Sequence, residues 1–186
     1  MHEDLIIAGF GGQGVMSMGQ MLAYAGLTEG KNVLWMPAYG PETRGGFANC
    51  TVIVSDMEIG SPIVSHPRSI IVMNLPSLDR FEDSVKPGGT LVVNTTLASR
   101  KVRRKDIDVI LVPATEVATE LGDLRAANMV ALGAFLECKP MISFKAVKKT
   151  LQKVFANKKS VIPLNEKALE RGAEIAREQR KARSAV

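Results

Sequence analysis

The chain has 186 residues, of which 46% are hydrophobic and 23% charged, a composition typical of one globular domain. Its longest apolar stretch, Met129 to Leu136, is far shorter than the roughly 18–20 residues that a membrane-spanning helix needs. The net charge is +5, and from Lys139 onward 13 Lys and Arg stand against 4 Glu. Only Phe144 and Phe155 are aromatic in that basic part, so we expect a solvated helical face there and no nucleic-acid partner.

Short runs rich in Val and Ile alternate with helix-length segments along the chain. The first run, Leu5 to Phe10, ends in glycines and precedes a helical segment without proline from about Gln13 to Glu29. The other predicted strands are 32–36, 48–55, 69–74, 90–94 and 108–112, and the other predicted helices are about 77–85, 115–121, 125–139, 144–157 and 166–183. Runs such as 70–73 and 109–112 are continuously apolar, which is typical of strands buried on both faces.

This order predicts an α/β fold with a single doubly wound, mostly parallel sheet that is Rossmann-like and carries helices on both faces. The C-terminal helices are expected to pack outside. We treat residues 1–186 as one domain with a basic helical segment from about 143 to 186.

Few residues offer catalytic or metal-binding chemistry. Cys50 and Cys138 are 88 positions apart and form no cluster motif, so we predict no metal site and no disulfide framework. His2 is terminal and His66 precedes a proline, so we assign no catalytic residue. Asn128 is the only polar residue between positions 126 and 136, and it either bonds across an interface or is satisfied within the chain. The acidic N-terminus lacks the basic start of a secretory signal, which favours the cytoplasm.

Residues 9–14, Gly-Phe-Gly-Gly-Gln-Gly, match the pattern G-x-G-x-x-G between the first strand and the first helix. Backbone N–H groups at a helix N-terminus favour an anion, and glycines let a phosphate approach the main chain. The acidic residue expected about 20 positions later in an NAD site is missing, because the second strand ends Leu34-Trp35-Met36-Pro37. The motif argues against a nicotinamide dinucleotide and leaves another phosphorylated or anionic ligand, or a tight turn that binds nothing.

Residues Pro37 to Gly46 form the second informative segment, a predicted loop of about ten residues between two strands. Within it, Arg44 precedes Gly45 and Gly46 and offers a guanidinium to a carboxylate or phosphate. The alternative is a surface ion pair with Glu42. Because both loops follow strands, we expect them to lie side by side at the carboxyl edge of the sheet.

Three segments, the glycine loop at 9–15, residues 38–50 and residues 125–134, together resemble the gamma subunit of 2-oxoacid:ferredoxin oxidoreductases. The resemblance covers nearly the whole chain. It implies a complex that oxidatively decarboxylates a 2-oxoacid to an acyl-CoA and passes electrons to ferredoxin. The form Tyr-Gly-Pro-Glu at 39–42 resembles the 2-oxoglutarate and branched-chain (ketoisovalerate) enzymes more than the pyruvate ones.

The resemblance also implies cofactors, partners and site residues. Thiamine diphosphate and iron–sulfur clusters would lie in alpha, beta and ferredoxin-like partner subunits, and this chain would contribute to the coenzyme A site. The carried-over residues are Gly11, Gly12, Gln13, Gly14 and the helix start at 16–19, with Thr43, Arg44, Gly45 and Gly46 opposite. The isolated chain is expected to be inactive and to self-associate. A stand-alone nucleotide-binding or interaction module without catalysis is the alternative.

Overall fold

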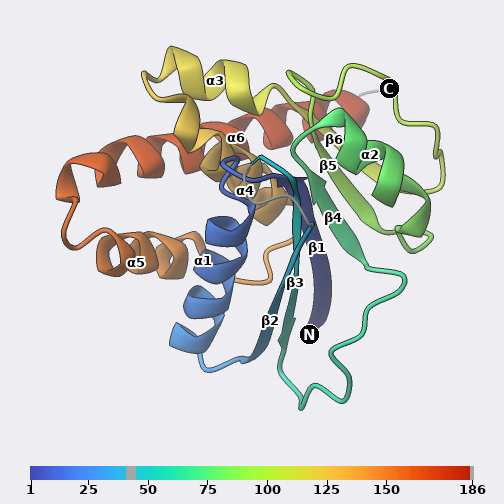
Figure 1. Ribbon diagram of the computed structural model, residues 1–186, viewed down its shortest axis with the longest axis horizontal. Coiled ribbons are helices and arrows are strands. Elements are labelled where there is room, and N and C mark those ends of the chain that lie inside the picture. Colours follow the sequence, from blue (N-terminus) through green and yellow to red (C-terminus); the bar gives the residue numbers. More distant parts are fainter. Residues whose placement is uncertain (41–44, 185–186) are drawn as a thin grey trace.

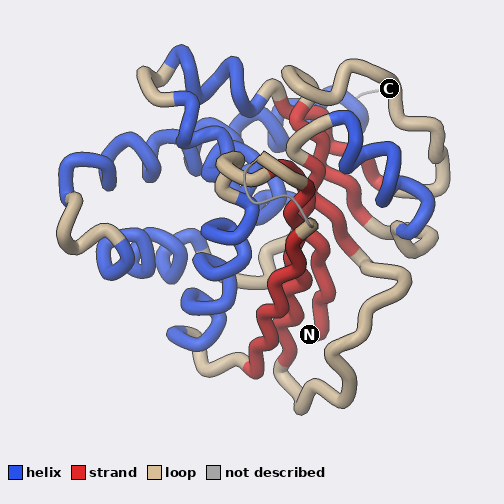
Figure 2. Tube along the Cα trace, viewed as in Figure 1, coloured by secondary structure: helices blue, strands red, loops and turns tan. Residues whose placement is uncertain are grey.

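The computed structural model describes residues 1–40 and 45–184 and places a six-stranded sheet between two unequal layers of helices (Figures 1 and 2). The spatial order of the strands is β2-β3-β1-β4-β5-β6. Their bounds are β1 (His2–Phe10), β2 (Asn32–Tyr39), β3 (Phe47–Ser55), β4 (Ser69–Val72), β5 (Thr90–Asn94) and β6 (Asp108–Val112). β1, β4, β5 and β6 pair in parallel, whereas β3 runs antiparallel to both β1 and β2. All strands except β3 therefore point the same way, and the predicted mostly parallel sheet is confirmed.

Helices cover both faces, as predicted, but unequally (Figure 1). One face carries α1 (Val15–Thr28), α3 (Ala114–Glu120), α4 (Ala127–Cys138), α5 (Phe144–Val154) and α6 (Ile162–Ser184). The other face carries α2 (Leu75–Phe81) and a short 3₁₀ turn at Glu82–Ser84. β1 is buried on both sides, since Leu5 and Ile7 join the larger core and Ile6 and Ala8 the smaller one. No helix in the two described ranges is long and apolar enough to cross a membrane.

Helix α4 lies in the middle of the larger layer, and ten of its 12 residues are buried. α6 packs on its outer side with almost no side chain between the two backbones. A Cβ added to Gly133 of α4 would lie 2.7 Å from the carbonyl carbon of Leu169 of α6, and one added to Gly172 would lie 2.8 Å from that of Val130. These two glycines allow the helices to touch, so the C-terminal helix is packed outside, as predicted.

The predicted strand 32–36 was too short, because β2 continues through Pro37 to Tyr39. The N–H of Gly40 donates to the carbonyl oxygen of Phe47 at 2.7 Å. Since hydrogen-bonded positions alternate along antiparallel strands, Pro37 occupies a position whose backbone nitrogen faces away from β3. β2 is an edge strand, so the missing N–H costs no ladder bond, and the segment after it is a hairpin connection.

Two helix starts also differ from the prediction for local reasons. α1 begins at Val15 and not at Gln13, because Gly14 has a left-handed φ of 73°. α2 begins at Leu75, earlier than predicted, because the side chain of Asn74 accepts a hydrogen bond from the N–H of Ser77 at 3.0 Å and caps the helix.

Candidate functional site

The glycine loop after β1 leads directly into the N-terminus of α1. Gly12 and Gly14 have φ values of +94° and +73°, which L side chains rarely adopt. Gly14 is the N-cap of α1; no side chain caps the helix, and its first turn contains no acidic residue. The first N–H groups of a helix have no partner inside the helix. This terminus can therefore donate to an anion, as the sequence motif indicated.

Gly14 is also required by its neighbour on α4. A Cβ at Gly14 would lie 2.8 Å from Cγ of Asn128. The Nδ2 group of Asn128 donates to the carbonyl oxygen of Gly14 at 3.3 Å, and the residue is 7% exposed. Of the two sequence alternatives for Asn128, the structure supports a bond within the chain. Asn128 thereby fixes the start of α1 against the start of α4.

Gln13 fills the space between the ends of β1 and β4. Its Oε1 accepts from the N–H of Phe10 at 2.7 Å and from Nδ2 of Asn74 at 2.8 Å, and its Nε2 donates to the carbonyl oxygen of Met73 at 3.4 Å. α1 and α2 leave the sheet on opposite faces at this point, which is where open α/β sheets usually bind ligands. Gln13 anchors the glycine loop to the sheet here, and a direct ligand contact of its side chain stays a prediction.

The two predicted loops lie side by side, as expected. The N–H of Gly11 donates to the carbonyl oxygen of Gly46 at 2.8 Å, and a Cβ at Gly11 would lie 3.3 Å from the backbone nitrogen of Gly45. Gly45 has a φ of +67°, and a Cβ built there would meet none of the residues that the structure describes within 4 Å. Thr43 and Arg44, the other two residues predicted for this loop, lie outside the described residues.

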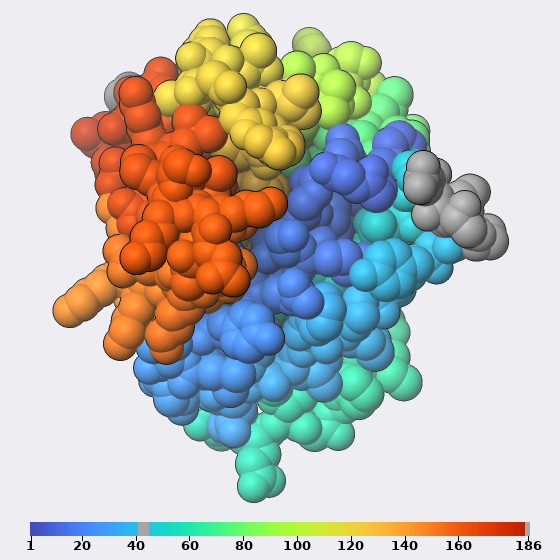
Figure 3. All heavy atoms as spheres, turned by 60° about the vertical axis from the view of Figure 1, so that its left-hand side comes forward, coloured from blue at the N-terminus to red at the C-terminus, as the bar shows by residue number. Residues whose placement is uncertain are grey.

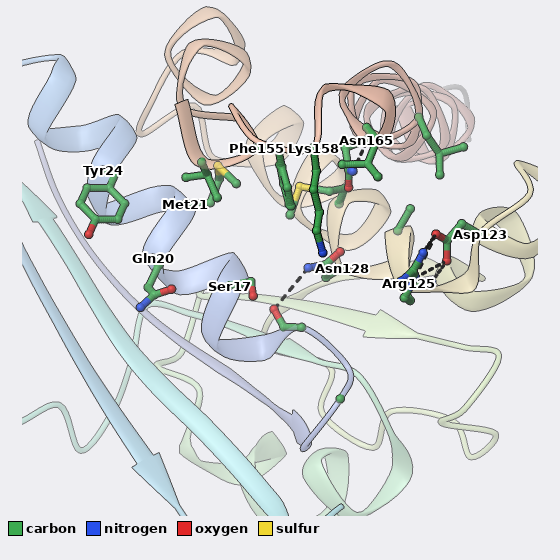
Figure 4. A pocket seen from close by; sticks show the side chains of 17 residues that line it. Ser17, Gln20, Met21, Tyr24, Asp123, Arg125, Asn128, Phe155, Lys158 and Asn165 are labelled. Carbon is green, nitrogen blue, oxygen red and sulfur yellow. Dashed lines mark hydrogen bonds and ion pairs between the residues drawn. The ribbon is translucent and has the colours of Figure 1, made fainter. Parts of the chain in front are cut away.

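A groove of about 380 Å³ opens beside the glycine loop. Figure 3 shows this side of the molecule, with the blue surface of α1 next to the yellow and orange surfaces of the later helices. Three segments line the groove: the loop and α1, the residues around the start of α4, and the connection between α5 and α6. Met129 lines the groove, as do the residues labelled in Figure 4, which are Ser17, Gln20, Met21, Tyr24, Asp123, Arg125, Asn128, Phe155, Lys158 and Asn165.

The groove combines an apolar floor with positive charge. Met21 and Met129 are each 2% exposed and form part of the floor. Arg125 pairs with Asp123 through Nη2 and Oδ2 at 2.6 Å, and this pair holds the pKa of the Asp123 carboxyl below its usual range. Lys158 points into the groove toward Asn128 (Figure 4) and forms no ion pair with any residue that the structure describes. The groove fits an anionic ligand that also carries an apolar part.

The described residues contain no activated thiol and no cluster suited to a metal. Among residues 1–40 and 45–184, no three His, Cys, Asp or Glu side chains come together as metal ligands. Burial raises the pKa of Cys50 to about 12 and that of Cys138 to about 11, so both thiols are protonated at neutral pH. The described residues around the groove are therefore suited to binding a ligand.

Sequence reasoning found the glycine side of the groove and missed most of its opposite wall. Ser17 belongs to the helix start at 16–19 that the resemblance carried over, and Arg125 and Asn128 belong to a segment that it used. Lys158 and Asn165 carried no motif. Lys158 stands in a Lys-rich connection between helices, and its role depends on α5 and α6 folding back beside α1. No local sequence pattern predicts that α5 and α6 pack beside α1.

A family model described as pyruvate ferredoxin/flavodoxin oxidoreductase matches residues 4–175. Ketoisovalerate oxidoreductase subunit VorA of Methanothermobacter thermautotrophicus is 43% identical over 173 residues, which cover 92% of this chain and 36% of VorA. The 2-oxoglutarate synthase subunit KorC of Methanocaldococcus jannaschii is 31% identical over 181 residues, which cover 96% of each chain. The chain thus spans about a third of the length of VorA and nearly the whole length of KorC.

Solved structures give the same result. The gamma subunit of a keto/oxoacid ferredoxin oxidoreductase from Geobacter sulfurreducens superposes with a TM-score of 0.80 at 28% identity, covering 94% of this chain and 98% of that one. A 2-oxoglutarate:ferredoxin oxidoreductase from Magnetococcus marinus, with 2-oxoglutarate, coenzyme A and succinyl-CoA bound, gives 0.88 at 25% identity and covers 95% of this chain and 31% of that one. The family match, these relatives and the fold agree that the chain belongs to the pyruvate ferredoxin/flavodoxin oxidoreductase family.

Proposed function

We propose that this chain acts as the gamma component of a 2-oxoacid:ferredoxin oxidoreductase and that its groove forms part of the coenzyme A site. The observation that carries the proposal is the uncapped N-terminus of α1, which opens with two left-handed glycines into a groove containing Lys158 and Arg125. Coenzyme A supplies the thiol that accepts the acyl group. This chain would bind and orient the phosphorylated part of that molecule.

The chemistry of the groove fits such a ligand. Coenzyme A carries several phosphates and an aromatic base, so it needs N–H donors or cations together with apolar surface. The glycine loop supplies N–H groups, Lys158 supplies a cation, and Met21 and Phe155 supply apolar surface. A Cβ at Gly12 would meet none of the described residues within 4 Å, so these residues leave the outer side of the loop open to an approaching group. Gly11, Gly12, Gly14, Gly45 and Gly46 remain the proposed contacts, with Gln13, Thr43 and Arg44 carried over from the sequence prediction.

The proposal leaves the remaining chemistry to other subunits. Thiamine diphosphate and iron–sulfur clusters would be held by alpha, beta and ferredoxin-like subunits, and ferredoxin would accept the electrons. We place the complex in the cytoplasm and expect the isolated chain to be inactive and to self-associate. The named substrates of the relatives, ketoisovalerate and 2-oxoglutarate, make these two acids the first to be tried.

The test is the replacement of Lys158 by Gln in the assembled complex. Loss of one charge-assisted contact should raise the KM for coenzyme A by about 10-fold and leave the KM for the 2-oxoacid unchanged. Lys101→Gln is the matched control, since Lys101 is exposed on the connection between β5 and β6 and lies outside the groove. An unchanged KM for coenzyme A with both variants would contradict the proposed site.

A stand-alone nucleotide module predicts a different result. In that case the chain would bind a nicotinamide dinucleotide or another nucleotide by itself and would purify without stoichiometric partners. Titration of the chain with NAD and with coenzyme A, each followed calorimetrically, separates the two functions.

A further inference from the structure

Lysines gather on α5 and on the connection that follows it. Residues 144–159 contain six lysines and no acidic residue. Ala146, Val147, Thr150 and Leu151 are the buried side of the helix, which places the lysines outside. Only Lys148 of these six forms an ion pair within the described residues, with Glu170 of α6. The rest of the positive charge has no counterpart in the part of the chain that the structure describes.

An exposed apolar patch lies beside these lysines, between α1 and α5. Tyr24, Leu27 and Val154 are 56%, 58% and 51% exposed, although each is a large apolar or aromatic residue. Together with Thr28, Thr150 and Lys153 they line a shallow depression of about 470 Å³, which we call the α1–α5 patch. An apolar centre surrounded by charged residues is the usual anatomy of a protein–protein interface.

The α1–α5 patch is continuous with the groove. Tyr24 and Val154 line both depressions, and Lys158 lies on the groove side of the same helix–helix connection. A protein that covers the patch would therefore also reach the edge of the groove. Exclusion of water from that edge would strengthen every polar contact to a ligand inside it.

The charge of the surroundings decides which partner fits. A second copy bound through this face would meet the patch with the same patch, so lysines would oppose lysines. Like charges across an interface repel, whereas acidic residues around an apolar projection would complement the patch. VorA and the Magnetococcus marinus chain extend far beyond the region that matches this chain, which covers 36% and 31% of them. In those proteins a large polypeptide is attached to the equivalent of this chain and is available to cover the patch.

We propose that the α1–α5 patch docks another subunit of the oxidoreductase, which inserts an apolar side chain into the depression and surrounds it with acidic residues. The docking proposal rests on the proposed function in one respect, which is that the partner belongs to the same oxidoreductase complex. The docked subunit closes the outer edge of the groove. The lysine face of α5 is thus an assembly surface.

The experiment uses the chain co-expressed with the other subunits of its oxidoreductase. Leu27→Asp should weaken assembly by about 30-fold, as expected for a central interface residue. The double variant Lys149→Glu/Lys153→Glu should weaken it by about 10-fold at low salt and much less at about 1 M salt, where the Debye length is about 3 Å. Lys101→Glu/Lys105→Glu is the matched control, because both lysines are exposed on the connection between β5 and β6. Circular dichroism and melting curves confirm that each variant folds.

A photo-reactive residue at position 27 identifies the partner. Cross-linking to an acidic segment of another subunit supports the proposal. Cross-linking to a second copy, co-purification of nucleic acid that depends on the α5 lysines, or assembly that withstands both patch variants overturns it. Acyl-CoA formation by the unaltered complex is measured separately. If the docking proposal is overturned while acyl-CoA formation is normal, the proposed function stands. If instead the patch variants weaken assembly but the unaltered complex forms no acyl-CoA, the docking proposal stands and the proposed function is wrong.

Discussion

The contact between α4 and α6 gives the sharpest stability prediction, for the variant Gly133→Ala. A methyl group at Gly133 would lie 2.7 Å from the carbonyl carbon of Leu169, whereas ordinary carbon–carbon contacts are about 3.5–4.0 Å. The obstacle is backbone and no side-chain rotation relieves it, so α4 and α6 must separate by roughly 1 Å. Overpacking costs roughly 1–3 kcal/mol, and a rigid backbone places this site at the upper end. The higher helix propensity of alanine offsets about 1 kcal/mol of this loss in unfolding free energy.

The expected net loss is about 2 kcal/mol of unfolding free energy, or about 4–8 °C in Tm for a domain of this size. Urea denaturation and calorimetry measure both quantities. Gly60→Ala is the matched control, because its Cβ would meet no residue of 1–40 or 45–184 within 4 Å, and it should stay within about 0.5 kcal/mol of the unaltered protein. A Gly133→Ala protein as stable as the unaltered one would refute the backbone contact between these helices.

Three further predictions test other parts of the structure. Gly14→Ala should reduce both stability and coenzyme A affinity, because it combines a φ of +73° with a collision against Asn128. Gly12→Ala, whose Cβ would meet none of the described residues within 4 Å, isolates the effect of the backbone strain in the same urea and titration assays. Burial raises the pKa of Glu3, so the folded state holds its proton more tightly and stability falls as the pH rises above about 4.5. Glu3→Gln should therefore raise Tm at pH 7 and leave it unchanged near pH 4. Glu82→Gln should cost about 2–4 kcal/mol and expose the connection after β5 to protease, because it removes the buried negative charge that pairs with Nη1 of Arg100 at 2.7 Å.

The sequence predicted the strand positions better than their directions. The strands 90–94 and 108–112 have the predicted bounds, because a Val- and Ile-rich run between turn residues is a local signal. The reversed direction of β3 was not predictable in this way, since direction depends on which strands pair. The extension of β2 through Pro37 has the same cause: it requires knowledge that β2 lies at an edge.

Of the candidate site, the sequence predicted the two glycine-containing loops and the start of α1. The neighbouring positions of Gly11 and Gly46 followed from the general rule for carboxyl edges of parallel strands. The anchoring of Gln13 depends on Asn74, 61 positions away, and the place of Lys158 depends on the fold-back of the last helices. Long-range packing of this kind leaves no periodic trace in the sequence.

The reversed strand β3 has a consequence for how this fold can diversify. A parallel strand needs a helical crossover before the chain returns to the same edge, whereas the antiparallel pair β2–β3 returns through the few residues between Tyr39 and Phe47. A hairpin tip tolerates changes of length and composition that an embedded strand-to-helix turn does not. The glycine loop, which is held by the sheet, meets the end of this β2–β3 connection through the hydrogen bond between Gly11 and Gly46. Related chains can thus differ in the length and composition of this connection while keeping the same sheet.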